Sequence, residues 1–436
     1  MSIEWLTILM FGSMLLFLAL GFPFAWVTGG LGVIFGFFLF GPNTFQLYIL
    51  RMWDLMMNFG FVAIPLFVFM ANVLRYAGIA DDLYEAVYHW LGGLRGGLAM
   101  TTVAVCTVMA AMLGTAGGGI AIMGLIALPA MLQRKYNKGI ALGSILAGGT
   151  LGVMIPPSIQ FVLYGMFAGQ SVGRLFIGGI GPGLVLSGLY ITYIGVRSYL
   201  QRDLAPALPK EMRSVSLRQH FGYVRALILP IILILIVLGT IYGGVATPGE
   251  AAGIGAVGAM LSAGVRRRLN WGNLKAAVYA TLRTTSTILW ISFGAITFVA
   301  TYQLAGGDTF MANIITGLEL SPWLTLIGIQ IILIIMGMFL DLISILVLTV
   351  PIIVPIITSL GFNPLWFGVL YNINMQIAYI SPPFGYSLFY LKGVAPPEIN
   401  TGDIYRSVWP FIILQIIGLA LSMFFPQIIL WFPSLM

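Results

Sequence analysis

The segments LAGGTLGVMIPPSIQFVLYGMFAG (residues 146–169) and NINMQIAYISPPFGYSLFYLKG (residues 372–393) decide the fold of this chain. Each is apolar enough to lie in a membrane and carries a Pro-Pro pair at its centre. Proline removes a backbone donor and clashes with the carbonyl one turn earlier, so we expect each helix to break there. Unwound backbone at membrane depth is tolerated only where it is buried in protein or lines a cavity. Two such breaks therefore predict the binding site of a secondary transporter.

An internal repeat relates the two segments. Pro129 precedes Pro156 by 27 positions, and Pro355 precedes Pro382 by the same 27, so both prolines recur at an offset of 226. At this offset two further pairs coincide, Thr115 with Asp341 and Tyr164 with Tyr390. Matched spacing with matched flanks indicates a duplication of about half the chain.

The composition is that of a polytopic membrane protein. Of 436 residues 60% are hydrophobic and 8% are charged, and the mean hydropathy is +1.02. The single cysteine, Cys106, excludes a disulfide within the chain. The net charge of +7 does not indicate nucleic-acid binding, because the basic residues lie in short loops where membrane orientation explains them.

Two long apolar stretches, 96–133 and 321–359, precede the two broken helices. The first has the glycine-rich centre GTAGGG at 114–119, and the second turns near GMFLD at 337–341. Re-entrant hairpins explain these stretches better than straight helices. Two full crossings remain the alternative, although each limb offers only about 17 apolar residues, near the lower limit for a span.

The charges set an expected orientation. If the polar loop 197–225 is cytoplasmic, 18 of the 20 Lys and Arg fall inside, and only Arg51 and Arg174 fall outside. The two hairpins then open from opposite sides, as an inverted repeat requires. The expected fold is an all-α polytopic membrane protein with an inverted repeat, two re-entrant hairpins and two broken helices.

Four stretches resemble the signature of the large membrane subunit of tripartite ATP-independent periplasmic (TRAP) transporters. They are GTAGGGIAIMGLIALPAMLQRKYNKGIALGSILAGGTLGVMIPPSIQFVLYGMFAG (114–169), VATPGEAAGIGAVGA (245–259), GMFLDLISILVLTVPIIVPI (337–356) and SPPFGYSLFYLKGVAP (381–396). The resemblance implies an elevator transporter of the bacterial inner membrane, in which a mobile domain of hairpins and broken helices moves past a scaffold. It also implies that sodium ions, two or more, drive uptake of a small organic acid anion, a carboxylate or a sulfonate.

The resemblance implies two protein partners besides the lipid bilayer. A soluble periplasmic protein would deliver the substrate, and a small four-helix membrane subunit would brace the scaffold. Because this chain begins directly with the large subunit's first span, we expect the small subunit to be a separate polypeptide. Two features depart from common family members: the first hairpin tip is glycine-rich rather than serine-rich, and Gln376 replaces a frequent glutamate.

The expected domains follow this plan. They are scaffold and arm helices of the first repeat (1–95), the first transport-domain half (96–170), scaffold helices (171–282) with the cytoplasmic linker 197–225, scaffold and arm of the second repeat (283–320), the second transport-domain half (321–396) and a C-terminal transmembrane helix (397–436).

An unwound helix exposes carbonyl oxygens, which suit a small hard cation, while the following half-helix points its positive end at an anion. We therefore expect one sodium between each hairpin tip and its break. The residues expected at the sodium sites are Gly114, Thr115, Gly149, Thr150 and Pro156 in the first half, and Gly337, Asp341, Ser344, Ser381 and Pro382 in the second. The residues expected at the substrate are Thr115, Gly117, Ser158, Asn374, Ser381 and Tyr386.

Asp341 is the sharpest single candidate, because it is a carboxylate inside a long apolar run. A charge at such depth costs about 3 kcal/mol or more and by default marks function. The alternative is a carboxylate that caps the start of a hairpin helix, and both roles can coexist.

Other residues have simpler explanations. The pattern Gly253-x-Gly255-x-x-Gly258 matches a dinucleotide fingerprint but lies in an apolar span, so close helix packing is favoured. Glu250 follows Thr247-Pro248 and suits a helix start. Tyr164 and Tyr390 can be explained as interfacial residues.

Three other functions are alternatives for this chain. A stand-alone cation-coupled organic anion carrier of the same architecture would need no binding protein. An intramembrane enzyme is disfavoured because the chain lacks HExxH, paired intramembrane aspartates and a GxSxG elbow. A passive channel would not need two matched halves around one site.

Overall fold

A computed structural model describes residues 2–207, 217–317 and 319–435, which exclude part of the expected linker 197–225. Helices form 81% of the structure, and the described ranges contain no strand. Within these described ranges, six helices are long and apolar enough to cross a membrane, which confirms the expected polytopic all-α class. They are Phe59–Tyr76, Ala116–Gln133, Val172–Leu200, Trp271–Leu304, Leu342–Ser359 and Thr401–Phe424.

The helices fall into two groups, those before and those after the linker between residues 200 and 217. The first comprises α1 (Ile3–Ala19), α2 (Phe24–Phe40), α3 (Thr44–Met56), α4 (Phe59–Tyr76), α5 (Ile79–Leu91), α6 (Gly97–Leu113), α7 (Ala116–Gln133), α8 (Lys138–Thr150), the 3-10 turn η1 (Leu151–Val153), α9 (Ile159–Ala168) and α10 (Val172–Leu200). The second comprises α11 (Leu217–Tyr242), α12 (Pro248–Val265), α13 (Trp271–Leu304), α14 (Gly307–Gly317), α15 (Pro322–Gly337), α16 (Leu342–Ser359), α17 (Pro364–Ile380), α18 (Tyr386–Val394), α19 (Thr401–Phe424), α20 (Gln427–Leu430) and η3 (Pro433–Leu435).

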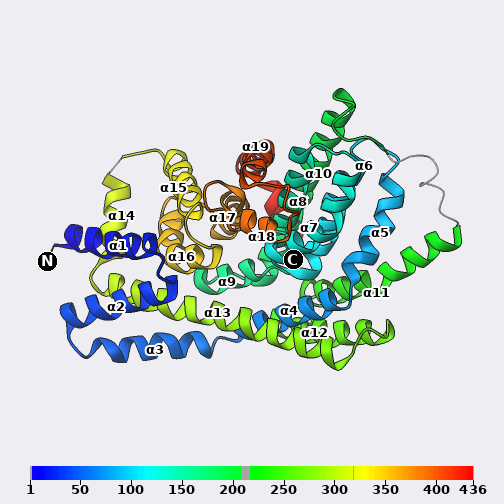
Figure 1. Cartoon of the computed structure of the whole chain (residues 1–436). Coiled ribbons are helices and arrows are strands. Elements are labelled where there is room, and N and C mark those ends of the chain that lie inside the picture. Colours follow the sequence, from blue (N-terminus) through cyan, green and yellow to red (C-terminus); the bar gives the residue numbers. More distant parts are fainter. Residues whose placement is uncertain (1, 208–216, 318, 436) are drawn as a thin grey trace.

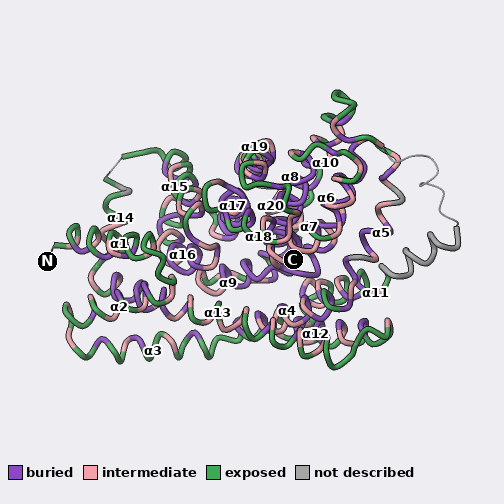
Figure 2. Tube along the Cα trace, viewed as in Figure 1, coloured by how far each residue is buried: buried purple, intermediate pink, exposed green. Residues whose placement is uncertain are grey.

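The broken helices lie at the centre of an elongated molecule. Figure 1 shows α8, α9, α17 and α18 in the middle, with α13 running below them, beside α2 and α4 and above α3 and α12. Figure 2 shows that buried residues concentrate in this central group, while the outer helices carry exposed residues. Many of those exposed residues are large and apolar, including Phe38 and Leu200. An apolar outer surface is what a protein surrounded by lipid requires.

The helix bounds repeat along the chain. Helix α7 spans 116–133 and α16 spans 342–359, so both ends differ by 226, the offset of the proline pairs. Helices α8 and α17 begin at 138 and 364, which again differ by 226. In both halves a helical hairpin therefore precedes a helix that ends before a Pro-Pro pair, at Thr150 in the first half and at Ile380 in the second.

One expected boundary does not appear. A division was expected at 282, between the scaffold helices 171–282 and the scaffold and arm of the second repeat, 283–320, whereas α13 is one continuous helix of 34 residues. In the first half the corresponding region is two helices, α3 and α4, separated at Asn58, whose side chain caps α4. The second half lacks such a break, so the expected division at 282 falls inside a helix.

Helix starts follow local capping chemistry. Thr247 and Glu250 form a capping box at α12, in which each side chain accepts from the other residue's backbone N–H. This finding supports the structural explanation of Glu250. The packing explanation of the nearby glycines also holds in part, because a Cβ at Gly255 or Gly258 would collide with Met70 or Leu233, whereas Gly253 faces open space.

Helices α2 and α13 cross at close range through Gly32. A Cβ at this position would lie 2.8 Å from the backbone nitrogen of Phe298. The Gly32 carbonyl also accepts hydrogen bonds from Tyr48 of α3 at 2.8 Å and from Thr301 of α13 at 3.0 Å. Small residues at such crossings allow backbones to approach, which drives helix association in lipid.

Gly32→Ala should therefore destabilise the protein, by about 1–3 kcal/mol, the usual cost of overpacking. The control is Gly30→Ala in the same helix, where nothing lies within 4 Å of an added Cβ. Alanine is the better helix former, so the control should be neutral or stabilising. Thermal unfolding of the detergent-solubilised protein measures both. Equal melting temperatures for the two variants would contradict the close crossing.

Candidate functional site

The tip of the first hairpin is formed by two residues between α6 and α7. Gly114 ends α6 in the left-handed conformation, with φ of +61°, which glycine adopts without strain. Thr115 is extended and begins α7, and its side chain makes no capping hydrogen bond. Its partly exposed hydroxyl is therefore not committed to the helix start.

The first broken helix unwinds in the way that its prolines predict. Helix α8 ends at Thr150, the turn η1 follows, and a cis Pro156-Pro157 bond precedes α9. Ser158 is fully buried, and its hydroxyl donates to the Val153 carbonyl at 2.6 Å, within the unwound segment. The break is thus a compact, fully buried loop of backbone.

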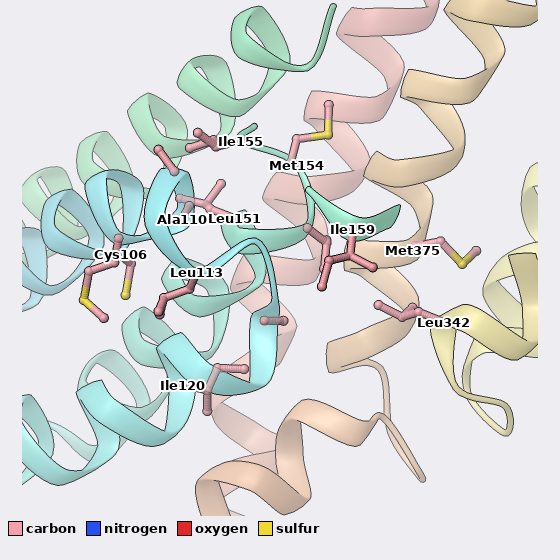
Figure 3. Close-up of a cluster of buried hydrophobic side chains, with 14 of the residues drawn as sticks. Cys106, Ala110, Leu113, Ile120, Leu151, Met154, Ile155, Ile159, Leu342 and Met375 are labelled. Carbon is pink, nitrogen blue, oxygen red and sulfur yellow. The ribbon is translucent and has the colours of Figure 1, made fainter. Parts of the chain in front are cut away.

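The hairpin tip lies directly against this break. A Cβ at Gly152 would lie 2.5 Å from the Thr115 carbonyl oxygen, and one at Gly114 would lie 2.6 Å from the Pro157 carbonyl oxygen. The Ile159 N–H donates to the Gly114 carbonyl at 3.5 Å. Figure 3 shows Leu113 and Ile120, one from each hairpin limb, close to the break, with Ile159 between the tip and the start of α16. The backbone of the tip is therefore in direct contact with the backbone of the break.

The second hairpin tip carries Asp341. This residue is extended at the start of α16, and its carboxylate accepts from the Ile343 N–H at 2.9 Å. It also accepts from the Ser344 hydroxyl. The expected capping role is therefore present in the structure. The Asp341 carboxylate and the Ser344 hydroxyl thus form a hydrogen-bonded pair at the tip, in which Asp341 is partly exposed and Ser344 is buried.

The second tip also contacts its own break. A Cβ at Gly337 would lie 2.2 Å from the Cβ of Ala378 in α17, and the rings of Phe339 and Phe384 are 5.9 Å apart. Beyond α17, Ser381 donates to the Ile377 carbonyl at 2.7 Å, and a cis Pro382-Pro383 bond follows. In both halves the tip therefore contacts the broken helix, through backbone in the first half and through side chains in the second.

Each half also packs on the other. Helix α9, which follows the first break, packs on α16 of the second hairpin, and α18, which follows the second break, packs on α7 of the first. Tyr164 of α9 donates to the Pro364 carbonyl at 2.8 Å, and Tyr390 of α18 covers Gly117 of α7, where a Cβ would lie 3.0 Å from its ring. Tyr164 is fully buried, so its explanation as an interfacial residue is wrong.

Several expected site residues are turned toward other partners. The Thr150 hydroxyl donates to the Ala147 carbonyl at 2.8 Å and accepts from Gln415 of α19 at 3.2 Å. The Asn374 amide donates to the backbone carbonyl of Gln330 on α15 at 2.8 Å. Tyr386 is 39% exposed and stacks on Tyr379. The structure therefore places Thr115 and Ser158 together at the first break, but Asn374 faces the second hairpin.

Two buried glutamines complete the central region. Gln160 of α9 is 4% exposed and Gln376 of α17 is fully buried, and none of their amide atoms has a hydrogen-bonding partner within the described structure. Buried amides are normally satisfied, so these two are candidates to contact a ligand or water. Gln160 escaped the sequence reasoning, although a lone amide two residues after Pro-Pro-Ser was a usable signal.

The described part of the chain has no cluster of acidic, histidine or cysteine side chains that could bind a metal ion. Among the described residues, no group of three or more His, Cys, Asp or Glu could hold one. A cation at either break would depend chiefly on carbonyl and hydroxyl oxygens, which are suitable ligands for a hard ion. A hydroxyl that donates its hydrogen to a neighbouring carbonyl, as Ser158 and Ser381 do, keeps lone pairs for such a cation.

Comparison with known proteins places this geometry among membrane transporters. Residues 11–428 match the family model described as tripartite ATP-independent periplasmic transporter, DctM component. The chain is 30% identical over 397 residues to the C4-dicarboxylate TRAP transporter large permease protein DctM of Pseudomonas aeruginosa, covering 91% of each chain. It is 31% identical to the isethionate TRAP transporter permease protein DctMQ of Oleidesulfovibrio alaskensis, covering 98% of this chain and 66% of that one.

Another relative and a solved structure extend the comparison. The ectoine TRAP transporter large permease protein TeaC of Halomonas elongata is 29% identical, with 99% of each chain covered. The crystal structure of the Alcanivorax borkumensis YdaH transporter superposes with a TM-score of 0.64, at 15% identity, over 96% of this chain and 99% of that one. At 15% identity, the likeness to the YdaH transporter concerns the fold alone.

Proposed function

The chain belongs to the DctM component family of tripartite ATP-independent periplasmic transporters, and from this premise we propose that it performs sodium-coupled uptake of a small organic acid anion. Members of this family are multi-pass permeases of the inner membrane and not enzymes. Secondary transport of organic acids is the activity of the family. The sodium coupling, the substrate and the partners of this chain are the parts that we propose.

One observation carries the proposal: each hairpin tip rests on its own Pro-Pro break, and the helix beyond each break packs on the other hairpin. An inverted repeat would produce this exchange, and the common offset of 226 supports it. We infer that hairpins and broken helices move together as an elevator past α2, α4, α12 and α13. The hairpins would then be re-entrant, and the substrate would ride between the two halves.

The proposed sodium sites use different donors. At the first break, carbonyl oxygens near Thr115 and Pro157 would surround the ion, with the Thr115 hydroxyl available. At the second, the Asp341 carboxylate and Ser344 hydroxyl would contribute, which gives this site a full negative charge. A cation held at either site would lower the cost of bringing an anion to the adjacent unwound backbone.

The proposed substrate is a carboxylate or sulfonate of low molecular weight. One relative is named for C4-dicarboxylates, which are carboxylates, and another for isethionate, which is a sulfonate. Half-helix starts, hydroxyls, the bound cation and the unpaired amides of Gln160 and Gln376 would hold the anion. A periplasmic binding protein would deliver it, and a small membrane subunit would complete the complex.

Uptake in proteoliposomes tests this proposal. The chain and its small membrane partner would be reconstituted, and radiolabelled organic acids and sulfonates would be offered with and without an inward sodium gradient and the cognate binding protein. We expect saturable uptake that needs both. Sodium-driven uptake indifferent to the binding protein would favour a stand-alone carrier, and uptake driven only by protons would contradict the sodium sites.

A further inference from the structure

A pocket of about 430 Å³ is lined by residues outside both Pro-Pro breaks, although Tyr405, next to its lining residue Arg406, donates to the Pro383 carbonyl of the second break at 2.6 Å. The pocket is formed where the start of α8, the end of α10 and the start of α19 meet. Its charged residues are Lys138, Arg197, Arg406 and Asp403. The charge distribution of the sequence places this end in the cytoplasm. Volumes of this size accommodate small ligands.

The pocket carries an excess of positive charge. Asp403 is its single carboxylate and is already paired with Lys138, with 2.9 Å between Nζ and Oδ2. Arg197 is held by neutral groups, because its guanidinium donates to the Tyr193 hydroxyl and the Gln201 side-chain oxygen, each at 3.2 Å. Within the described part of the chain neither Arg197 nor Arg406 forms an ion pair. In the described structure no carboxylate lies within ion-pair distance of either arginine, although Arg406 is near enough to Asp403 to interact with it electrostatically, so both guanidinium groups can bind an external anion.

An apolar groove continues from the pocket along the outside of α10. This second hollow, of about 310 Å³, shares Tyr193 and Arg197 with the pocket and is lined by Leu189, Val196, Leu200 and Leu414. Val196 and Leu200 are 55% and 79% exposed, so they face the surroundings of the protein. An occupant that fills both hollows has an anionic end beside Arg197 and a long apolar end along α10.

We propose that this pocket and groove bind one anionic phospholipid, with the phosphate at Arg197 and Arg406 and an acyl chain along α10. Basic pockets between transmembrane helices on the cytoplasmic side favour anionic headgroups. A soluble anion would leave the apolar groove unused, and an apolar protein helix would leave the two arginines without a partner. The lipid would bridge α8, α10 and α19. The inference stands independently of the transported substrate.

Native mass spectrometry of the detergent-solubilised chain tests this site with phosphatidylglycerol as the probe and phosphatidylcholine as the zwitterionic comparison. The double variant Arg197→Gln/Arg406→Gln should lower the bound fraction of phosphatidylglycerol at least about tenfold. The matched control is Arg267→Gln/Arg268→Gln, which removes two exposed arginines beyond α12 and should retain wild-type binding. Equal binding by the two double variants would overturn the proposal.

A second variant separates a lipid from a free anion and guards against misfolding of the first. Thr192→Trp fills the groove, which Thr192 lines, without changing any charge. It should also reduce phosphatidylglycerol binding, and millimolar inorganic phosphate should fail to displace the lipid from the wild type. Unchanged lipid binding in this variant, or displacement by phosphate alone, would show a site for free anions and overturn the lipid assignment.

Discussion

Asp341→Asn should lower sodium-driven uptake at least about tenfold, a loss of about 1.4 kcal/mol or more in the rate-limiting step. The substitution removes the negative charge from the second hairpin tip but preserves its helix cap. Asparagine caps a helix start about as well as aspartate, so the hydrogen bond from the Ile343 N–H should survive. The expected defect is therefore one of cation binding. Initial uptake rates over a range of sodium concentrations in proteoliposomes would measure it.

The capping role is isolated by two companion variants. Asp341→Ala removes both charge and cap, and should additionally lower the melting temperature of the purified protein. Ser344→Ala removes the hydroxyl that donates to the carboxylate but keeps the charge, so it should impair uptake less than Asp341→Asn. Wild-type uptake by Asp341→Asn, in protein that inserts normally, would leave capping as the only role of this residue.

Gly152→Ala is expected to have a comparable effect for a steric reason. The single added carbon would lie 2.5 Å from the Thr115 carbonyl oxygen and 2.9 Å from its carbonyl carbon, so the first hairpin tip must shift away from the break. Displacement of binding groups by about 1 Å can cost on the order of 100-fold in rate. We expect uptake to fall by about tenfold to 100-fold, measured in the same proteoliposomes.

The matched control is Gly188→Ala in α10, where nothing lies within 4 Å of the added carbon. This variant should transport like the wild type. Gly152→Ala leaves Asp341 and Ser344 of the second proposed sodium site unchanged. The uptake that remains in this variant should therefore still depend on sodium, which distinguishes a defect at the first site from one at the second. Normal uptake by Gly152→Ala would mean that the close contact of tip and break is not needed in the transport cycle.

The elements that local chemistry determines could be predicted from the sequence. Both breaks were expected from proline's missing donor; α17 ends two residues before its Pro-Pro pair, whereas α8 ends six residues before its pair, with the turn η1 between them. The first hairpin turn was expected at the glycine-rich segment 114–119 and the second near 337–341, and the helices do end and begin there, with Gly114 after α6 and Asp341 before α16. The division of the chain into two halves was predicted from the 226-residue offset between the two sets of prolines alone.

Features that depend on distant partners could not be predicted. Asn374 was expected near the substrate, yet its amide donates to Gln330, 44 residues earlier. Gln160 left a partial signal, an amide two residues after Pro-Pro-Ser, but its burial without a partner depends on helices from both halves. Nothing in the residues around 283 shows that α13 continues where the first half has a break at Asn58.

The packing of α9 on the second half has a consequence for biosynthesis. This helix has only 10 residues, about 15 Å of length, so it cannot cross a bilayer by itself. Its Tyr164 finds the Pro364 carbonyl 200 residues later, and at about 5–20 residues per second a ribosome needs roughly 10–40 s to reach that partner. Until then the first half has to wait in the membrane in another arrangement. The insertion machinery therefore handles α9 before its packing partner exists. The final site can form only after nearly the whole chain has been made.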